Sequence, residues 1–196
     1  MTTNKSRPRG RPRRFDPDAA VATAQQLFHA RGYDAVSVAD VTDALGINPP
    51  SFYAAFGSKA GLYVRVLDHW TATEAIPLAD ILRPDVPVAA ALGEVLVDAA
   101  RRYAADSTAG GCLVLEGTRC TDAQARAAAL ALNRGAEAFI HAYVAARHPA
   151  EAEAVTDFVS TTMSGLSAKA RSGHDLPRLL STARLAERAL GDILRE

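Results

Sequence analysis

Apolar side chains recur every three or four residues along most of this chain, a spacing that places them on one face of an α-helix. Glycine, proline and polar clusters interrupt the pattern, and no long run alternates apolar and polar residues as a half-buried β-strand does. Alanine is abundant and only 6% of the 196 residues are aromatic, which also favours helices. The sequence therefore predicts an all-α fold of about nine helices.

The interruptions also predict where the helices end and how the chain is divided. We expect helices over residues 17–31, 38–45, 49–55, 59–76, 88–105, 112–119, 122–148, 149–171 and 176–194. Three prolines between residues 77 and 87 mark the clearest linker. The predicted organisation is a flexible basic arm (1–14), a helical head (15–76) and a larger helical body (77–196).

Within the head, residues 37–56 predict two short helices joined by a tight turn. Ser37 is a candidate N-cap, and Asp40 three residues later completes an acidic capping box. Gly46 follows the apolar face of the first helix, where a left-handed residue commonly ends a helix. Two phenylalanines four residues apart would anchor the second helix to a core. Helix, short turn, helix is the layout of a DNA-binding helix-turn-helix.

The same stretch closely resembles the head of the TetR family of transcriptional regulators. The similarity runs from about residue 15 to 67 and is carried by Gly46, Ile47, Asn48, Tyr53, Phe56, Lys59 and Leu62. It implies that the second helix of the motif enters the major groove of double-stranded DNA. It also implies a homodimer on a near-palindromic operator, a small-molecule effector bound in the body, and no cofactor.

Candidate DNA contacts follow from this resemblance. The groove-facing set would be Asn48, Pro49, Pro50, Ser51 and Tyr53. Pro50 offers only apolar contact, for example to a thymine methyl group, so we expect few side chains to read bases directly and DNA shape to contribute to sequence preference. Ser37, Ser58 and Lys59 lie at helix N-termini, where phosphate groups are favoured.

The net charge of zero hides an asymmetry between the two ends of the chain. Residues 1–65 carry 9 basic and 5 acidic side chains, whereas residues 66–196 carry 13 and 17. The arm holds six basic side chains and no acid, among them Arg9, Arg11 and Arg13. It is either a solubilising tail, a phosphate-contacting arm or a minor-groove reader, because Arg9-Gly10-Arg11-Pro12 resembles the core of an AT-hook.

The body supplies candidates for an effector pocket and for a dimer interface. Predicted pocket-wall residues are Trp70, Tyr103, Phe139 and Tyr143. The last two helices, which form the dimer interface in the family, carry apolar stripes that include Phe158, Val159, Met163, Leu166, Leu180, Ala183 and Leu190. The alternative is that these stripes complete the core of the subunit itself.

Two other functions stay open alongside the effector-released repressor. Cys112 and Cys120 lie eight residues apart near a short predicted helix, so they either sense oxidants or electrophiles or are small buried apolar residues. The same alternative includes a metal sensor, because His141 and His148 lie seven residues apart on one predicted helix face. No cysteine or carboxylate lies at a convincing partner spacing, so we assign no metal ligands. The basic arm also suits an architectural protein that binds DNA with little regard to sequence.

Other classes of protein are disfavoured. No phosphate-cradling glycine loop, His-Glu-x-x-His motif or nucleophile elbow is present, so we do not expect an enzyme. No apolar run approaches the roughly 20 residues that span a bilayer, and the basic N-terminus lacks an apolar signal core. Two cysteines do not make a disulfide scaffold, and we expect a cytoplasmic protein.

Overall fold

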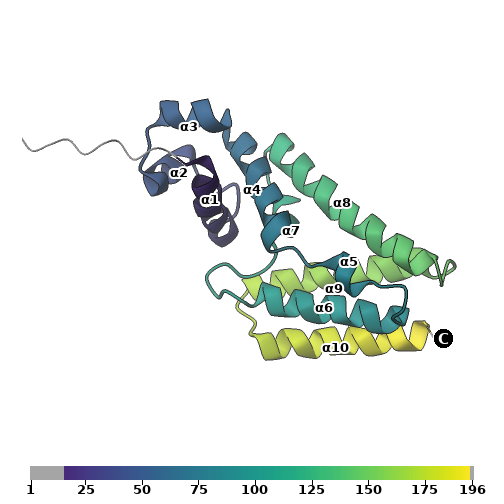
Figure 1. Ribbon diagram of the computed structural model, residues 1–196. Helices are drawn as coiled ribbons and strands as arrows, with labels where there is room; N and C mark the ends of the chain where they lie inside the picture. Colours follow the sequence, from purple (N-terminus) through teal and green to yellow (C-terminus); the bar gives the residue numbers. More distant parts are fainter. Residues whose placement is uncertain (1–15, 195–196) are drawn as a thin grey trace, which may run out of the picture.

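The computed structural model describes residues 16–194, which fold into ten α-helices with no β-strand in that range (Figure 1). The predicted all-α fold is confirmed. The additional helix is α5 (Leu78–Ile81), a single turn within the segment predicted as a linker. None of the helices in the described range is long and apolar enough to cross a bilayer.

Four capped helices form the N-terminal head, as the periodicity predicts. They are α1 (Pro17–Arg31), α2 (Val38–Leu45), α3 (Pro49–Phe56) and α4 (Lys59–Thr73), and a polar side chain caps the start of each. Gly46 ends α2 at φ 63° and ψ 35°, the left-handed conformation that glycine adopts most readily. This turn separates α2 from α3 and completes the helix-turn-helix.

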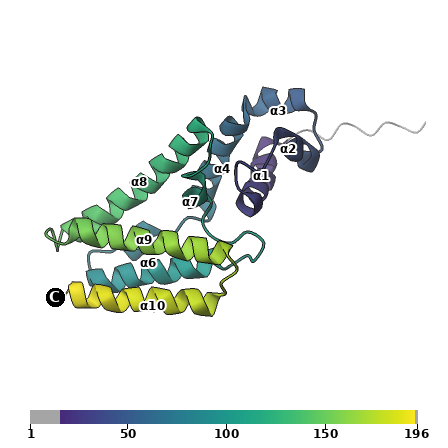
Figure 2. The ribbon, with the colours of Figure 1, turned by 180° about the vertical axis from the view of Figure 1, so that it is seen from behind.

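The body consists of the short α5 and five further helices. They are α6 (Val88–Tyr103), α7 (Leu113–Gly117), α8 (Ala123–Ala145), α9 (Ala152–Arg171) and α10 (Leu176–Ile193). Helices α6, α9 and α10 run side by side, and α8 rises diagonally from this layer towards α4 (Figures 1 and 2). Helix α9 begins after Pro149 rather than at it, because residues 146–151 form the turn from α8.

Buried side chains form two separate hydrophobic cores. One core lies among α6, α9, α10 and the end of α8, and includes Leu96, Tyr103 and Leu190. The other unites α1 to α4 around Phe28 and Tyr63. This head core does not stop at residue 76, because it also contains a group of side chains from α7, the following loop and the first turns of α8: Leu113, Cys120, Ala125 and Ala129.

Candidate nucleic-acid interface and cavity

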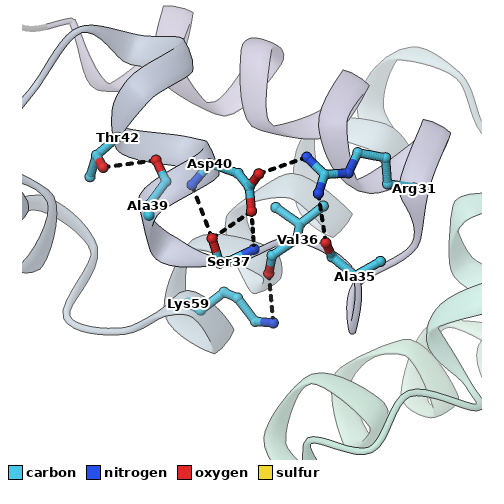
Figure 3. Close-up of polar contacts among 8 residues, drawn as sticks. All are labelled: Arg31, Ala35, Val36, Ser37, Ala39, Asp40, Thr42 and Lys59. Carbon is cyan, nitrogen blue, oxygen red and sulfur yellow. Dashed lines mark hydrogen bonds and ion pairs between the residues drawn. The ribbon is translucent and has the colours of Figure 1, made fainter.

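Hydrogen bonds among Arg31, Ser37 and Asp40 stabilise the start of α2 (Figure 3). Ser37 Oγ accepts the Asp40 N–H at 3.1 Å, and Asp40 Oδ2 accepts the Ser37 N–H at 2.7 Å, so the expected capping box is present. Arg31 Nη1 donates to Asp40 Oδ1 at 2.9 Å. The Ser37 hydroxyl, followed by Arg31, holds the pKa of Asp40 well below its usual range. The Ser37 hydroxyl is therefore already engaged beside an ionised carboxylate.

Helix α3 presents its predicted groove-facing residues to solvent. Phe52 is fully buried and fixes the inward face of the helix. Asn48 Oδ1 accepts the Ser51 N–H at 2.9 Å, which caps the helix start. The exposed residues include the whole predicted set, with Tyr53 at 52% exposure: Asn48, Pro49, Pro50, Ser51 and Tyr53. Their contacts with DNA stay a prediction.

Lys59, which follows the motif in the chain, has a structural role that the sequence did not reveal. Lys59 Nζ donates to Tyr33 O at 3.0 Å and to Val36 O at 2.9 Å, and it lies 3.9 Å from the centre of the Tyr33 ring. The ammonium group thereby fastens the loop before α2 to the start of α4 and keeps one N–H for another acceptor. Ser58 Oγ is also engaged, because it accepts the Gly61 N–H at 2.9 Å. The arm residues Arg9, Arg11 and Arg13 lie outside the described residues.

A cavity of about 470 Å³ lies among α4, α5, α6, α7, α8 and α9. Three of the residues expected in the wall of an effector pocket line it: Trp70, Tyr103 and Phe139. The remaining wall is mostly apolar, with Glu74, Arg102 and Asn133 among its few polar side chains. Size and lining both fall in the range of small-molecule sites, which are largely apolar with a few polar groups.

Tyr143 does not line this cavity, which corrects the sequence-based assignment. Its hydroxyl donates to Arg83 O at 3.0 Å and to Val86 O at 3.1 Å. The guanidinium carbon of Arg147 lies 4.3 Å from the centre of its ring. Tyr143 therefore fastens the loop between α5 and α6, because the phenol satisfies backbone carbonyls there.

The pKa of both cysteine thiols is raised, although only Cys120 is buried from solvent and Cys112 is half-buried. Cys112 lines the cavity, and its backbone N–H donates to Ser167 Oγ at 2.9 Å. Burial raises the pKa of the Cys112 thiol, and burial is also the main cause of the raised pKa of Cys120. A raised pKa keeps a thiol protonated, whereas redox and electrophile sensors need the thiolate. In residues 16–194, no group of three or more His, Cys, Asp or Glu side chains is placed to hold a metal ion.

Two groups of hydrogen bonds join the head to the body, and the sequence did not predict either of them. In the first, His29 Nε2 donates to Gly111 O at 3.0 Å, while Arg171 Nη2 donates to His29 O at 3.0 Å. Burial is the main cause of a lowered pKa for His29, which favours the neutral ring. In the second, the Asp34 carboxylate accepts the Thr121 N–H at 3.0 Å and its hydroxyl at 2.7 Å.

The last two helices divide their apolar residues between the interior and the surface. Four predicted interface residues are buried in the core of the protomer, because α9 and α10 use them to pack on α6: Val159, Leu166, Ala183 and Leu190. They are therefore not available to a partner. Met163 lines the cavity and Leu180 is half-buried. Phe158 is 37% exposed, and Leu185 and Ile193 are more exposed still.

Comparison with known proteins gives consistent matches. Residues 20–66 match the model of bacterial regulatory proteins of the tetR family. The chain is 58% identical over 196 residues to the HTH-type transcriptional repressor BdcR of Escherichia coli (strain K12), covering 100% of both chains. It is 29% identical over 188 residues to the HTH-type transcriptional repressor ComR of the same strain, covering 89% of each.

A solved complex shows the same architecture on DNA. It contains a cysteine mutant of the TetR family transcriptional regulator CifR with 26bp double-strand operator DNA. The TM-score is 0.82 at 31% identity, over 91% of this chain and 99% of that chain.

Proposed function

The chain belongs to the TetR family and is therefore a helix-turn-helix transcriptional regulator; we propose that it is a homodimeric repressor, released from a near-palindromic operator when a small molecule fills the cavity. The 58% identity to the repressor BdcR supports repression rather than activation. The operator-bound relative CifR supports DNA binding through the head. A two-fold dimer requires matching half-sites separated by one or more helical turns.

The observation that carries the effector proposal is the position of the cavity between the two cores. Trp70 belongs to the core of the head and Tyr103 to the core of the body, and both line the cavity. A molecule bound there contacts both parts, so its binding free energy depends on how they are arranged. A ligand that fits the displaced arrangement better lowers operator affinity by the difference in its two binding free energies. The lining favours a mostly apolar ligand with a polar end near Glu74 and Arg102.

The exposed faces of α9 and α10 are the proposed dimer interface. Phe158, Leu185 and Ile193 are exposed at 37%, 56% and 52% in the single chain. Gly165 and Ala168 are exposed on the same side of α9 as Phe158, since they follow it by seven and ten residues. Small residues let two helices approach closely, and the large apolar side chains gain burial from that approach.

In the proposed complex, α3 enters the major groove and the basic arm follows the phosphate backbone. The contact residues are those expected from the sequence: Asn48, Pro49, Pro50, Ser51, Tyr53, Ser58 and Lys59, with Ser37 at the start of α2. Because the hydroxyls of Ser37 and Ser58 and two N–H groups of Lys59 are engaged within the protein, the arm arginines supply most of the charge that meets phosphate.

The decisive test is selection of DNA by the full chain from a random-sequence pool, followed by affinity measurements at several salt concentrations. A two-fold-symmetric motif with a steep salt slope is the expected result, since each neutralised phosphate adds about 0.9 to the slope of log K against log salt. A chain without residues 1–14 should select the same motif with a shallower slope. No motif, with all binding lost on removal of the arm, would instead indicate a sequence-tolerant architectural protein.

A further inference from the structure

The helix-turn-helix has an unusual charge for a DNA-binding element. Residues 32–58, all of them described, contain no Lys or Arg and carry three acids: Asp34, Asp40 and Asp43. The basic residues that flank this segment are Arg31, which pairs with Asp40, and Lys59, which donates to two backbone carbonyls. Sequence reading by α3 therefore takes place without a cationic side chain on the helix itself.

The first turn of α3 also lacks free backbone donors. Pro49 and Pro50 have no N–H group. The Ser51 N–H donates to Asn48 Oδ1 at 2.9 Å, and the Phe52 N–H donates to Asn48 O at 3.2 Å. A helix N-terminus commonly holds a phosphate through its unpaired N–H groups, and none remains here. The start of α3 is thus suited to contacts other than hydrogen bonds from the main chain.

The outermost ridge of α3 is apolar. Residues 50 and 54 each lie two positions from the buried Phe52, so each is rotated by roughly 160° from the inward face. Pro50 and Ala54 occupy these positions, and both are exposed. Ser51 and Tyr53 lie to either side, about 100° from Phe52. The centre of the exposed face therefore carries a pyrrolidine ring and a methyl group, with hydroxyls only at its flanks.

The chemistry of the major groove identifies what such a ridge can recognise. Guanine presents two acceptors, whose usual bidentate partners are Arg and Lys, and α3 has neither. Adenine is usually read by a bidentate Asn or Gln, but Asn48 Oδ1 already caps the helix. Thymine presents a C5-methyl group, which pairs with an apolar side chain. The N-terminal residues of a recognition helix are the ones that reach base edges.

We propose that α3 recognises thymine through its C5-methyl group, with Pro50 as the specificity-determining contact and Ala54 extending the same apolar surface, an inference that rests on the proposed operator binding by this helix. Ser51 and Tyr53 then supply hydrogen bonds to bases or phosphates on either side. Each half-site of the operator carries a thymine facing Pro50. Cationic contacts with phosphate come from side chains outside residues 32–58, whereas the methyl contacts that give sequence preference lie within this range.

The test replaces single thymines of the selected operator by deoxyuracil, which removes only the methyl group. Binding of the full chain is measured by fluorescence anisotropy at fixed salt. Loss of one buried methyl contact should weaken binding about fourfold, and replacement at the equivalent position of both half-sites about 16-fold. Deoxyuracil at positions outside the selected motif provides the matched DNA control.

Two protein variants assign the methyl contact to one residue. Pro50→Ser should bind the thymine and deoxyuracil operators with equal affinity, because the apolar partner of the methyl group is gone. Pro49→Ser changes an adjacent exposed proline that lies only about 60° from the inward face, and it should keep the fourfold difference. Circular dichroism and thermal midpoints establish that both variants are folded.

The experiment distinguishes failure of thymine-methyl recognition from failure of operator binding itself. A selected operator that tolerates deoxyuracil at every position would overturn thymine-methyl recognition and leave operator binding intact. Equal deoxyuracil sensitivity in the wild type and Pro50→Ser would overturn the assignment to Pro50. Failure to select any motif from the unmodified pool would overturn operator binding itself. A difference that is present in the wild type, lost in Pro50→Ser and kept in Pro49→Ser is the supporting result.

Discussion

The contact of α7 with α4 can be tested with a single methyl group. A Cβ atom added at Gly117 would lie 2.4 Å from the Tyr63 hydroxyl oxygen and 2.9 Å from Ala129 Cβ. Tyr63 cannot easily move away, because it is 1% exposed and packs edge-on against Phe28 at 5.1 Å between ring centres. We therefore expect Gly117→Ala to destabilise the protein.

The magnitude follows from three contributions. Overpacking a close-packed core costs about 1–3 kcal/mol. Displacing Tyr63 also weakens the hydrogen bond from its hydroxyl to Leu113 O at 3.3 Å, a loss of about 1 kcal/mol. Replacing glycine by alanine in a helix returns less than about 1 kcal/mol, since Gly117 is the last residue of α7. The expected net loss is about 2 kcal/mol in the free energy of unfolding.

Gly135→Ala is the matched control. It makes the same chemical change within α8, but nothing lies within 4 Å of the added Cβ atom. The gain in helix propensity should then stabilise the protein by up to about 1 kcal/mol. Urea unfolding monitored by circular dichroism gives both free energies, at equal protein concentration because a dimer is stabilised by mass action. Unfolding of Gly117→Ala at the same urea concentration as wild type or higher would refute the close packing of α7 on α4.

Three further predictions concern the head, the body and the cavity between them. Because burial lowers the pKa of His29 below its ordinary 6.5, the unfolded chain takes up a proton first as the pH falls below that value. The urea midpoint should therefore fall as the pH is lowered below about 6.5. His29→Gln should reduce that dependence, and an unchanged slope would contradict it. Asp34→Ala removes the acceptor of two Thr121 hydrogen bonds and should lower the free energy of unfolding by about 1 kcal/mol, in the same urea assay, because the site is exposed. Ala136→Phe partly fills the cavity and should abolish effector release while operator affinity, measured by anisotropy, is kept; full release in this variant would place the effector elsewhere.

The local features of the head could be predicted from the sequence because each depends on residues close together in the chain. The capping box of Ser37 and Asp40 spans three residues, and the left-handed Gly46 needs only its own backbone. The outward direction of Tyr53 followed from the four-residue spacing of Phe52 and Phe56, which fixes the inward face. The same locality explains why the helix-turn-helix was the strongest signal in the sequence.

The hydrogen bonds between head and body could not be predicted from the sequence, because they join residues that are far apart in the chain. His29 and Gly111 are 82 positions apart, and Asp34 and Thr121 are 87 apart. The spacing of apolar residues does not predict such long-range pairs. In the sequence, His29, Asp34 and Thr121 look like ordinary polar surface residues. The same limit affected Tyr143, whose aromatic character suggested a pocket wall although its hydroxyl had carbonyl partners in a distant loop.

The apolar stripes of α9 and α10 illustrate a different limit. Periodicity shows that a helix face is buried but does not identify the surface that buries it. Leu190 and Leu185 are both apolar residues of α10, yet Leu190 is fully buried in the protomer and Leu185 is 56% exposed. Only the packing of α10 on α6 separates the two faces.

The shared core of the head and α7 has a consequence for recombination between related regulators. The DNA-binding unit is discontinuous, since Leu113, Cys120, Ala125 and Ala129 complete the packing around Tyr63 although they follow the body helix α6 in the chain. A chimera joined only at the linker after α4 would place a foreign α7 against this head and leave mismatched side chains at the seam. Exchange of specificity therefore requires three junctions, one after the head and one at each end of residues 113–129, so that this segment moves together with the head. The part that must be exchanged as a unit is the packed surface around Tyr63, which is not one contiguous segment of the chain.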